Sequence, residues 1–165
     1  HPDKTRILEF GRYAASNRTE RGLGKPETFD FLGFTHICAK TRNGRFTVRR
    51  QTMRKRLRAK LSEVKTELRW RLTQPIPEQG AYLRAVLLGH TRYYGVPGNG
   101  AALQVFRHRL GWLWGRALRR RGNRRVPAWQ RLRGHFIRWL PIPHICHPWP
   151  SQRLAVFTQG KSPVR

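Results

Sequence analysis

The chain has 165 residues, a length that suits one sizeable domain, or one domain and part of another. It carries 35 Lys and Arg against 8 Asp and Glu, and the resulting formal net charge of +27 favours an anionic polymer as the partner. A hydrophobic fraction of 38%, with six Trp and eight Phe, argues against a disordered chain of the highly charged kind.

No run of about 20 apolar residues and no signal peptide occurs in the sequence. We therefore expect a cytoplasmic protein that does not associate with a membrane. The first residue is not Met, so we expect the chain to begin inside a longer protein. The two cysteines are too few for a disulfide scaffold, and Cys38, in an apolar strand-like run, is expected to be a reduced, buried thiol.

The first third of the chain predicts strands because it is rich in aromatic and β-branched residues. A short β-like run ends at Phe10, and a polar loop is expected over residues 11–26. Strands are expected over about 30–41 and 45–49. Asn43-Gly44 lies between them and predicts a hairpin with a type I′ turn, which needs positive φ at both central positions.

The hydrophobic period changes to three- and four-residue steps from residue 52 onward, which indicates amphipathic helices. Thr52 and Asn99 stand at positions typical of N-caps, and Pro77 suits the first turn of a helix. Gly122 and Pro127 are expected to end one helix and to begin the next. The helices are expected over about 52–74, 78–94, 99–121 and 127–140.

Strands therefore come first and helices afterwards, which predicts an α+β fold in which the two kinds of structure are segregated. Three parts are expected: residues 1–50 with strands and a hairpin, residues 51–140 with a helical bundle, and residues 141–165 as an irregular basic tail.

Catalytic chemistry is poorly supported by the sequence. The neighbouring carboxylates are Glu27 with Asp30 and Glu63 with Glu67, too few for a divalent-metal centre, and i,i+4 ion pairing accounts for the second pair. The cluster at 144–147 contains two His and one Cys but lacks the second ligand pair of a closed zinc site. We expect no cofactor, no metal and no catalytic residue in this chain.

Nucleic-acid binding is better supported. No Asp or Glu occurs from residue 79 to the end, and most of the positive charge there is arginine, whose planar fork pairs with phosphate and stacks on bases. Basic and aromatic residues alternate at 90–94 and 107–109, whereas Tyr94, Phe106 and Trp114 fit a helical core stripe. Five arginines within residues 119–125 repel one another unless a polyanion lies between them.

Several motifs resemble the reverse transcriptases encoded by bacterial group II introns. Residues 1–6 (HPDKTR) and 29–34 (FDFLGF) look like the last palm blocks of that family. Residues 88–99 (LGHTRYYGVPGN) are similar to the signature of its maturase domain, also called domain X or thumb. The segment from 138 to 150 looks like the C-terminal region of these proteins.

The resemblance implies that the parent protein reverse-transcribes RNA and helps its own intron to fold, splice and move. It also implies that the metal-binding aspartates lie upstream of Lys4, so Mg²⁺ is expected only in the missing part of the palm. Polymerisation by this chain alone is not expected, and no endonuclease domain is expected either. The fold implied is a β-hairpin remnant of a polymerase palm followed by an α-helical thumb or maturase bundle.

The family's thumb contacts the RNA/DNA template-primer duplex and, with neighbouring segments, group II intron RNA. By position, the resemblance assigns nucleic-acid contact to Lys4, Arg92, Tyr93, Arg107, Arg109, Arg119, Arg120, Arg121, Arg124 and Arg125. Tyr94 and Trp114 are assigned to packing. Two alternatives remain open: the thumb of an active RNA-directed DNA polymerase when an upstream palm is joined to it, and a general basic nucleic-acid-binding protein.

Overall fold

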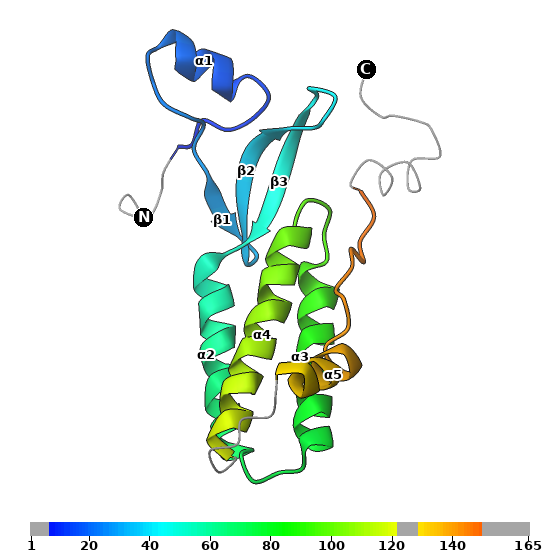
Figure 1. Cartoon of the computed structure of the whole chain (residues 1–165). Helices are drawn as coiled ribbons and strands as arrows, with labels where there is room; N and C mark the ends of the chain where they lie inside the picture. Colours follow the sequence, from blue (N-terminus) through cyan, green and yellow to red (C-terminus); the bar gives the residue numbers. More distant parts are fainter. Residues whose placement is uncertain (1–6, 122–128, 150–165) are drawn as a thin grey trace. The chain divides into compact units, whose positions relative to one another are not determined.

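The computed structural model describes residues 7–121 and 129–149 and shows an α+β protein with a three-stranded antiparallel sheet and five helices in those ranges (Figure 1). The chain divides into two compact units, His1–Met53 and Arg54–Arg165. The elements are α1 (Ala14–Glu20), β1 (Phe29–Phe31), β2 (Phe34–Lys40), β3 (Phe46–Thr52), α2 (Arg54–Trp70), α3 (Ile76–Tyr94), α4 (Gly100–Arg121) and α5 (Trp129–Trp139).

The sheet has the order β1-β2-β3, and the single strand expected over 30–41 is wrong because the chain turns within it. Phe31 pairs with Phe34, so only Leu32 and Gly33 connect β1 to β2. Both connecting residues have positive φ, +48° and +79°. A two-residue turn with positive φ at both positions is the type I′ pattern, which matches the twist of the flanking strands.

The hairpin expected around Asn43-Gly44 is confirmed, since β2 pairs with β3 from Phe34↔Thr52 to Lys40↔Phe46. The type I′ turn predicted for this hairpin is wrong, because Gly44 has positive φ, +73°, and Asn43 does not. The N–H of Gly44 donates to the carbonyl of Thr41 at 3.0 Å, which closes a longer loop in which only the last turn residue is left-handed.

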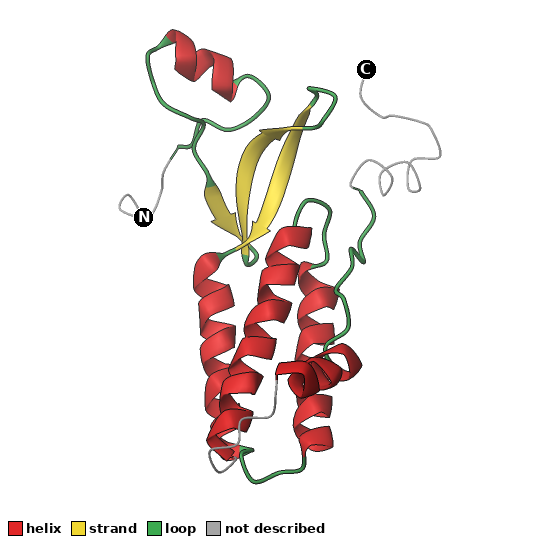
Figure 2. Ribbon diagram, viewed as in Figure 1, coloured by secondary structure: helices red, strands yellow, loops and turns green. Residues whose placement is uncertain are grey.

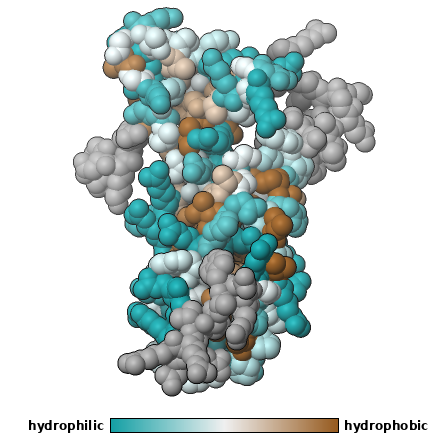
Figure 3. Space-filling view, in the orientation of Figure 1, coloured by the Kyte–Doolittle hydropathy of each residue, from teal (hydrophilic) through white to brown (hydrophobic). Residues whose placement is uncertain are grey.

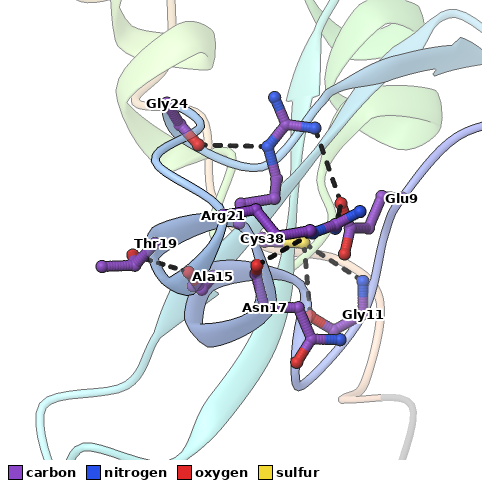
Figure 4. A network of polar contacts seen from close by, with 9 residues as sticks. Glu9, Gly11, Ala15, Asn17, Thr19, Arg21, Gly24 and Cys38 are labelled. Carbon is purple, nitrogen blue, oxygen red and sulfur yellow. Dashed lines mark hydrogen bonds and ion pairs between the residues drawn. The ribbon is translucent and has the colours of Figure 1, made fainter.

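A helix, α1, occupies part of the segment expected to be a loop, and the β-like run ending at Phe10 is not a strand. The carboxylate of Glu9 contacts the guanidinium groups of Arg18 and Arg21. The Cys38 thiol accepts from the Gly11 N–H at 3.4 Å and donates to the Gly11 carbonyl at 3.7 Å, contacts drawn in Figure 4. Through these two hydrogen bonds, the half-buried thiol connects the segment before α1 to β2.

In the second unit α2, α3 and α4 lie alongside one another, with α3 running opposite to the other two, and the shorter α5 packs on α3 (Figure 2). These are the four helices expected from the sequence; Gly122 and Pro127, expected to bound the last two, lie outside the described residues. Their apolar stripes form one core, made of Val64, Leu68, Leu83, Leu87, Phe106, Leu110, Trp114, Leu118, Leu132 and Leu140.

A polar side chain, Gln79, lies inside this core and is fully buried. Its amide oxygen accepts the indole N–H of Trp114 at 3.0 Å. Its amide nitrogen donates to the carbonyls of Arg71 at 2.9 Å and Gln74 at 3.0 Å, just after α2 ends. One side chain of α3 therefore joins α4 to the end of α2.

Helix α5 lies close against α3 at Gly80. A Cβ atom at Gly80 would lie 2.5 Å from ring atoms of Trp139, closer than real Cβ contacts allow. A Cβ atom at Gly89, on the same helix, would meet no packing neighbour within 4 Å beyond the adjacent backbone of its own helix. The contact between α3 and α5 thus depends on the missing side chain at Gly80.

We predict that Gly80→Ala lowers the free energy of unfolding by about 1–3 kcal/mol, the usual cost of overpacking a core. Gly89→Ala is the matched control and should raise it by up to about 1 kcal/mol, because Ala is the better helix former. Urea denaturation followed by circular dichroism measures both. Equal effects of the two substitutions would contradict the close approach of Trp139.

We also predict that Gln79→Leu lowers the free energy of unfolding by about 1–3 kcal/mol, because the indole N–H of Trp114 then stays buried without an acceptor. Adding Trp114→Phe removes that stranded donor. The double variant should therefore lose less than the sum of the two single losses. Strictly additive losses in urea denaturation would show that the two side chains are not coupled.

Candidate nucleic-acid interface

The exposed face of α4 carries cations around a half-exposed tryptophan, Trp112, whose side chain is 48% exposed. The neighbouring positions on this face are three or four residues apart, a spacing that places them in one row along a helix. The row consists of His108, Arg109, Trp112, Arg116, Arg119 and Arg120, all exposed. The row runs from residue 108 to residue 120 of α4, so it is roughly 18 Å long at about 1.5 Å per residue.

One side of this row borders a cleft between α4 and α5, with a volume of about 600 Å³. The α4–α5 cleft is lined by cationic residues and by apolar ones, namely Arg107, His108, Arg109, Gly111, Trp112, Arg133, Phe136, Ile137 and Leu140. Arg107 also has a structural role, since its Nε donates to the Leu140 carbonyl at 2.9 Å. This bond ties α4 to the end of α5.

The other side of the row borders a smaller cleft of about 140 Å³ between α2 and α4. The α2–α4 cleft is lined by Lys65, Leu68, Arg69, Leu72, Trp112, Leu113, Arg116, Ala117 and Arg120. The guanidinium carbon of Arg116 lies 4.6 Å from the centre of the Trp112 ring, a cation–π contact. Trp112 therefore forms part of the wall of both clefts.

Negative charge is scarce around these two clefts. Among the described residues, none that lines either cleft is Asp or Glu. The carboxylates of α2 are paired with nearby cations, Glu63 with Lys60 at 2.6 Å (i,i+3) and Glu67 with Arg71, the residue after the helix, at 2.7 Å (i,i+4, the expected spacing). On the face drawn in Figure 3, hydrophilic and hydrophobic residues are interspersed. A cationic surface with aromatic and apolar residues between the charges is suited to binding nucleic acid.

A third cleft, of about 350 Å³, lies between α2 and α3. Tyr93, 53% exposed, and Tyr94, half-buried, line it, with ring centres 4.8 Å apart. Burial, and then the neighbouring Tyr93, raise the pKa of Tyr94, while Arg56 opposes the shift. This cleft offers an exposed tyrosine ring beside the cations Arg56 and Lys60.

His90 forms the floor of the α2–α3 cleft and is only 8% exposed. Its ring stacks on Phe106 with centres 3.8 Å apart, and its Nε2 is buried without a hydrogen-bond partner among the described residues. Burial, and then the positive charge of Lys60, lower the pKa of His90 from 6.5 to about 4. The imidazole is therefore neutral at pH 7.

The structure places the sequence-predicted residues at two separate locations. Arg107 and Arg109 line the α4–α5 cleft, and Arg120 lines the α2–α4 cleft. Arg92 and Tyr93 lie at the end of α3, beside the start of α4 and thus far from its C-terminal arginines. The carbonyl of Arg92 accepts from the His147 ring at 2.7 Å, so the described part of the tail packs against this end of α3.

The structure describes only some of the remaining sequence-predicted residues. Arg119 is exposed on α4, and Arg121 is the last residue of that helix. Lys4, Arg124 and Arg125 lie outside the described residues. Of the two residues assigned to packing, Trp114 is fully buried and Tyr94 is half-buried.

Sequence reasoning missed Trp112 and Arg116, and also the flanking cations Lys65, Arg69 and Arg133. A signal for Trp112 was present, because this large aromatic residue falls outside the apolar stripe of its helix. Arg116 follows one turn later. No such signal exists for the cations of α2 and α5, because only the packing of those helices brings them to the clefts.

Two further observations concern metals and membranes. Within residues 7–121 and 129–149, no three His, Cys, Asp or Glu side chains gather closely enough to hold a metal ion. None of the helices described is both long enough and apolar enough to span a bilayer.

Comparison of the chain with family models, with curated proteins and with solved structures gives no match.

The low pKa of His90 predicts a pH dependence of stability. The unfolded chain, with a pKa near 6.5, binds the proton more tightly than the folded chain, so His90 contributes full stability above about pH 6.5 and loses it as the pH falls towards 4. We expect a loss of roughly 3 kcal/mol in the free energy of unfolding across this window. His90→Phe keeps a ring against Phe106 and should lack this part of the pH dependence.

Urea denaturation of both proteins between pH 4 and pH 7 measures this difference. The comparison removes the contributions of the groups that both proteins share. Parallel stability curves would contradict the buried, neutral state of His90.

Proposed function

We propose that the helical unit is an RNA-binding module, the thumb or maturase domain of a group II intron reverse transcriptase, and that the sheet unit derives from the end of the palm. The partners proposed are group II intron RNA and the RNA/DNA template-primer duplex. The module holds the RNA by charge and shape, and the cleavage chemistry of splicing belongs to the RNA.

The main observation that supports this proposal is the exposed face of α4. Its cations follow one row, the clefts on both sides add further cations, and no carboxylate lines either cleft among the described residues. Such a row can follow a phosphate backbone over several nucleotides, and each neutralised phosphate releases counterions. Arginine suits this role because its guanidinium group contacts phosphate in a bidentate manner.

The motif at 88–99 supports the choice of family. Its residues form the end of α3 and the turn into α4, and Asn99, fully buried, donates to the Tyr94 carbonyl at 2.8 Å. The Gly95 carbonyl accepts the N–H groups of Cys146 and His147 at 2.8 and 3.0 Å. The two stretches that resemble the family's maturase signature and C-terminal region therefore contact each other directly.

We predict that Arg109→Ala combined with Arg120→Ala weakens binding to a group II intron transcript and makes the salt dependence shallower. The slope of log K against log salt should fall in magnitude by about 0.7–0.9 for each phosphate that the protein no longer neutralises. Filter binding of the full chain at several salt concentrations measures the slope. Arg42→Ala with Arg45→Ala, in the hairpin loop of the sheet unit, removes the same charge and should leave the slope nearly unchanged.

An unchanged slope in the α4 variant, or an equal change in the hairpin control, would overturn the assignment of the interface to α4. Competition of the labelled intron transcript with bulk tRNA tests the family assignment separately. A maturase prefers the intron, whereas a general basic binder releases it in proportion to the competitor added.

A further inference from the structure

The α4–α5 cleft has features that a surface for phosphate contacts alone does not need. Its floor is apolar, formed by Gly111, Phe136 and Leu140, and its volume of about 600 Å³ falls in the range of about 300–1,000 Å³ typical of small-molecule sites. Phosphates of a duplex would contact only the cationic rim. The apolar floor calls for a planar or apolar group that enters the cleft.

Trp112 supplies a surface on which such a group can stack. Arg116 lies over the ring at 4.6 Å and lines the α2–α4 cleft together with it, while the same ring also borders the α4–α5 cleft. Trp112 is 48% exposed although Arg116 lies over its ring, so a further planar group can reach the ring. The cation–π contact also holds the indole in a defined orientation before any ligand arrives.

The rim of the cleft favours an anionic ligand. Arg107, Arg109 and Arg133 approach it from two helices, and the described residues that line it include no carboxylate. A nucleotide within an RNA strand combines a planar base with phosphates on both sides. Unpaired bases can be turned out of the stack and received by aromatic side chains, which paired bases cannot do.

We propose that the α4–α5 cleft binds a single unstacked nucleobase of an RNA loop or bulge, which stacks on Trp112 while the arginines of the rim contact the flanking phosphates. This inference rests on the proposed RNA-binding function and adds to it a site for one unpaired base.

The test uses the full chain and three RNAs: a duplex with one bulged uridine, the same duplex with an abasic residue at the bulge, and an uninterrupted duplex. Trp112→Ala should weaken binding of the bulged RNA about 10-fold and change the other two by less than about twofold. Trp112→Phe should recover part of the loss. Trp70→Ala is the matched control, since Trp70 is 80% exposed on α2 and lines neither cleft beside Trp112.

A second measurement needs no variant and therefore does not depend on how Trp112→Ala folds. A 2-aminopurine base at the bulge should lose fluorescence when the wild-type chain binds, because stacking on an aromatic ring quenches it. Unchanged fluorescence at saturating protein would overturn the base site.

The outcomes separate this inference from the function on which it rests. Equal weakening of all three RNAs by Trp112→Ala, or no weakening of any, overturns the base site. If Arg109→Ala with Arg120→Ala still flattens the salt dependence, the RNA-binding function stands without it. If neither α4 variant alters RNA binding, both proposals are wrong.

Discussion

The helical unit depends on the buried hydrogen bond between Gln79 and Trp114. A primary amide inside an apolar core is costly unless its donors and acceptor are satisfied, and here Trp114 and the backbone carbonyls of Arg71 and Gln74 satisfy them. These bonds connect α3 to α4 and to the end of α2. They therefore restrict how α4 can rotate about its axis.

The rotation of α4 decides which of its tryptophans faces outward. Trp112 and Trp114 are two residues apart, and at about 100° per residue their side chains point to nearly opposite sides of the helix. With Trp114 held in the core, Trp112 must lie at the surface, one turn from Arg116. The exposed row of α4 and the clefts on both sides of it are consequences of the same buried contact.

The separation between core and surface also bears on the strong positive charge of the chain. Among the residues of the helical unit whose burial the structure describes, no Lys, Arg, Asp or Glu is buried, and the cations lie on the outer faces of the helices. Their mutual repulsion opposes folding, whereas an RNA strand along α4 would relieve it. The charges that cost stability in the free protein are thus the ones available for binding.

The sequence by itself determined the α+β class, the four long helices and the hairpin before Phe46, because these depend on local periodicity and turn chemistry. It also determined the cationic character of the second half, which follows from composition alone. Only the tertiary structure decided that Gln79 is buried, that Lys65 and Arg133 flank Trp112, and that Tyr93 lies far from the C-terminal arginines of α4. A helical period defines the faces of one helix, but which face is covered, and by what, depends on neighbours distant in the chain.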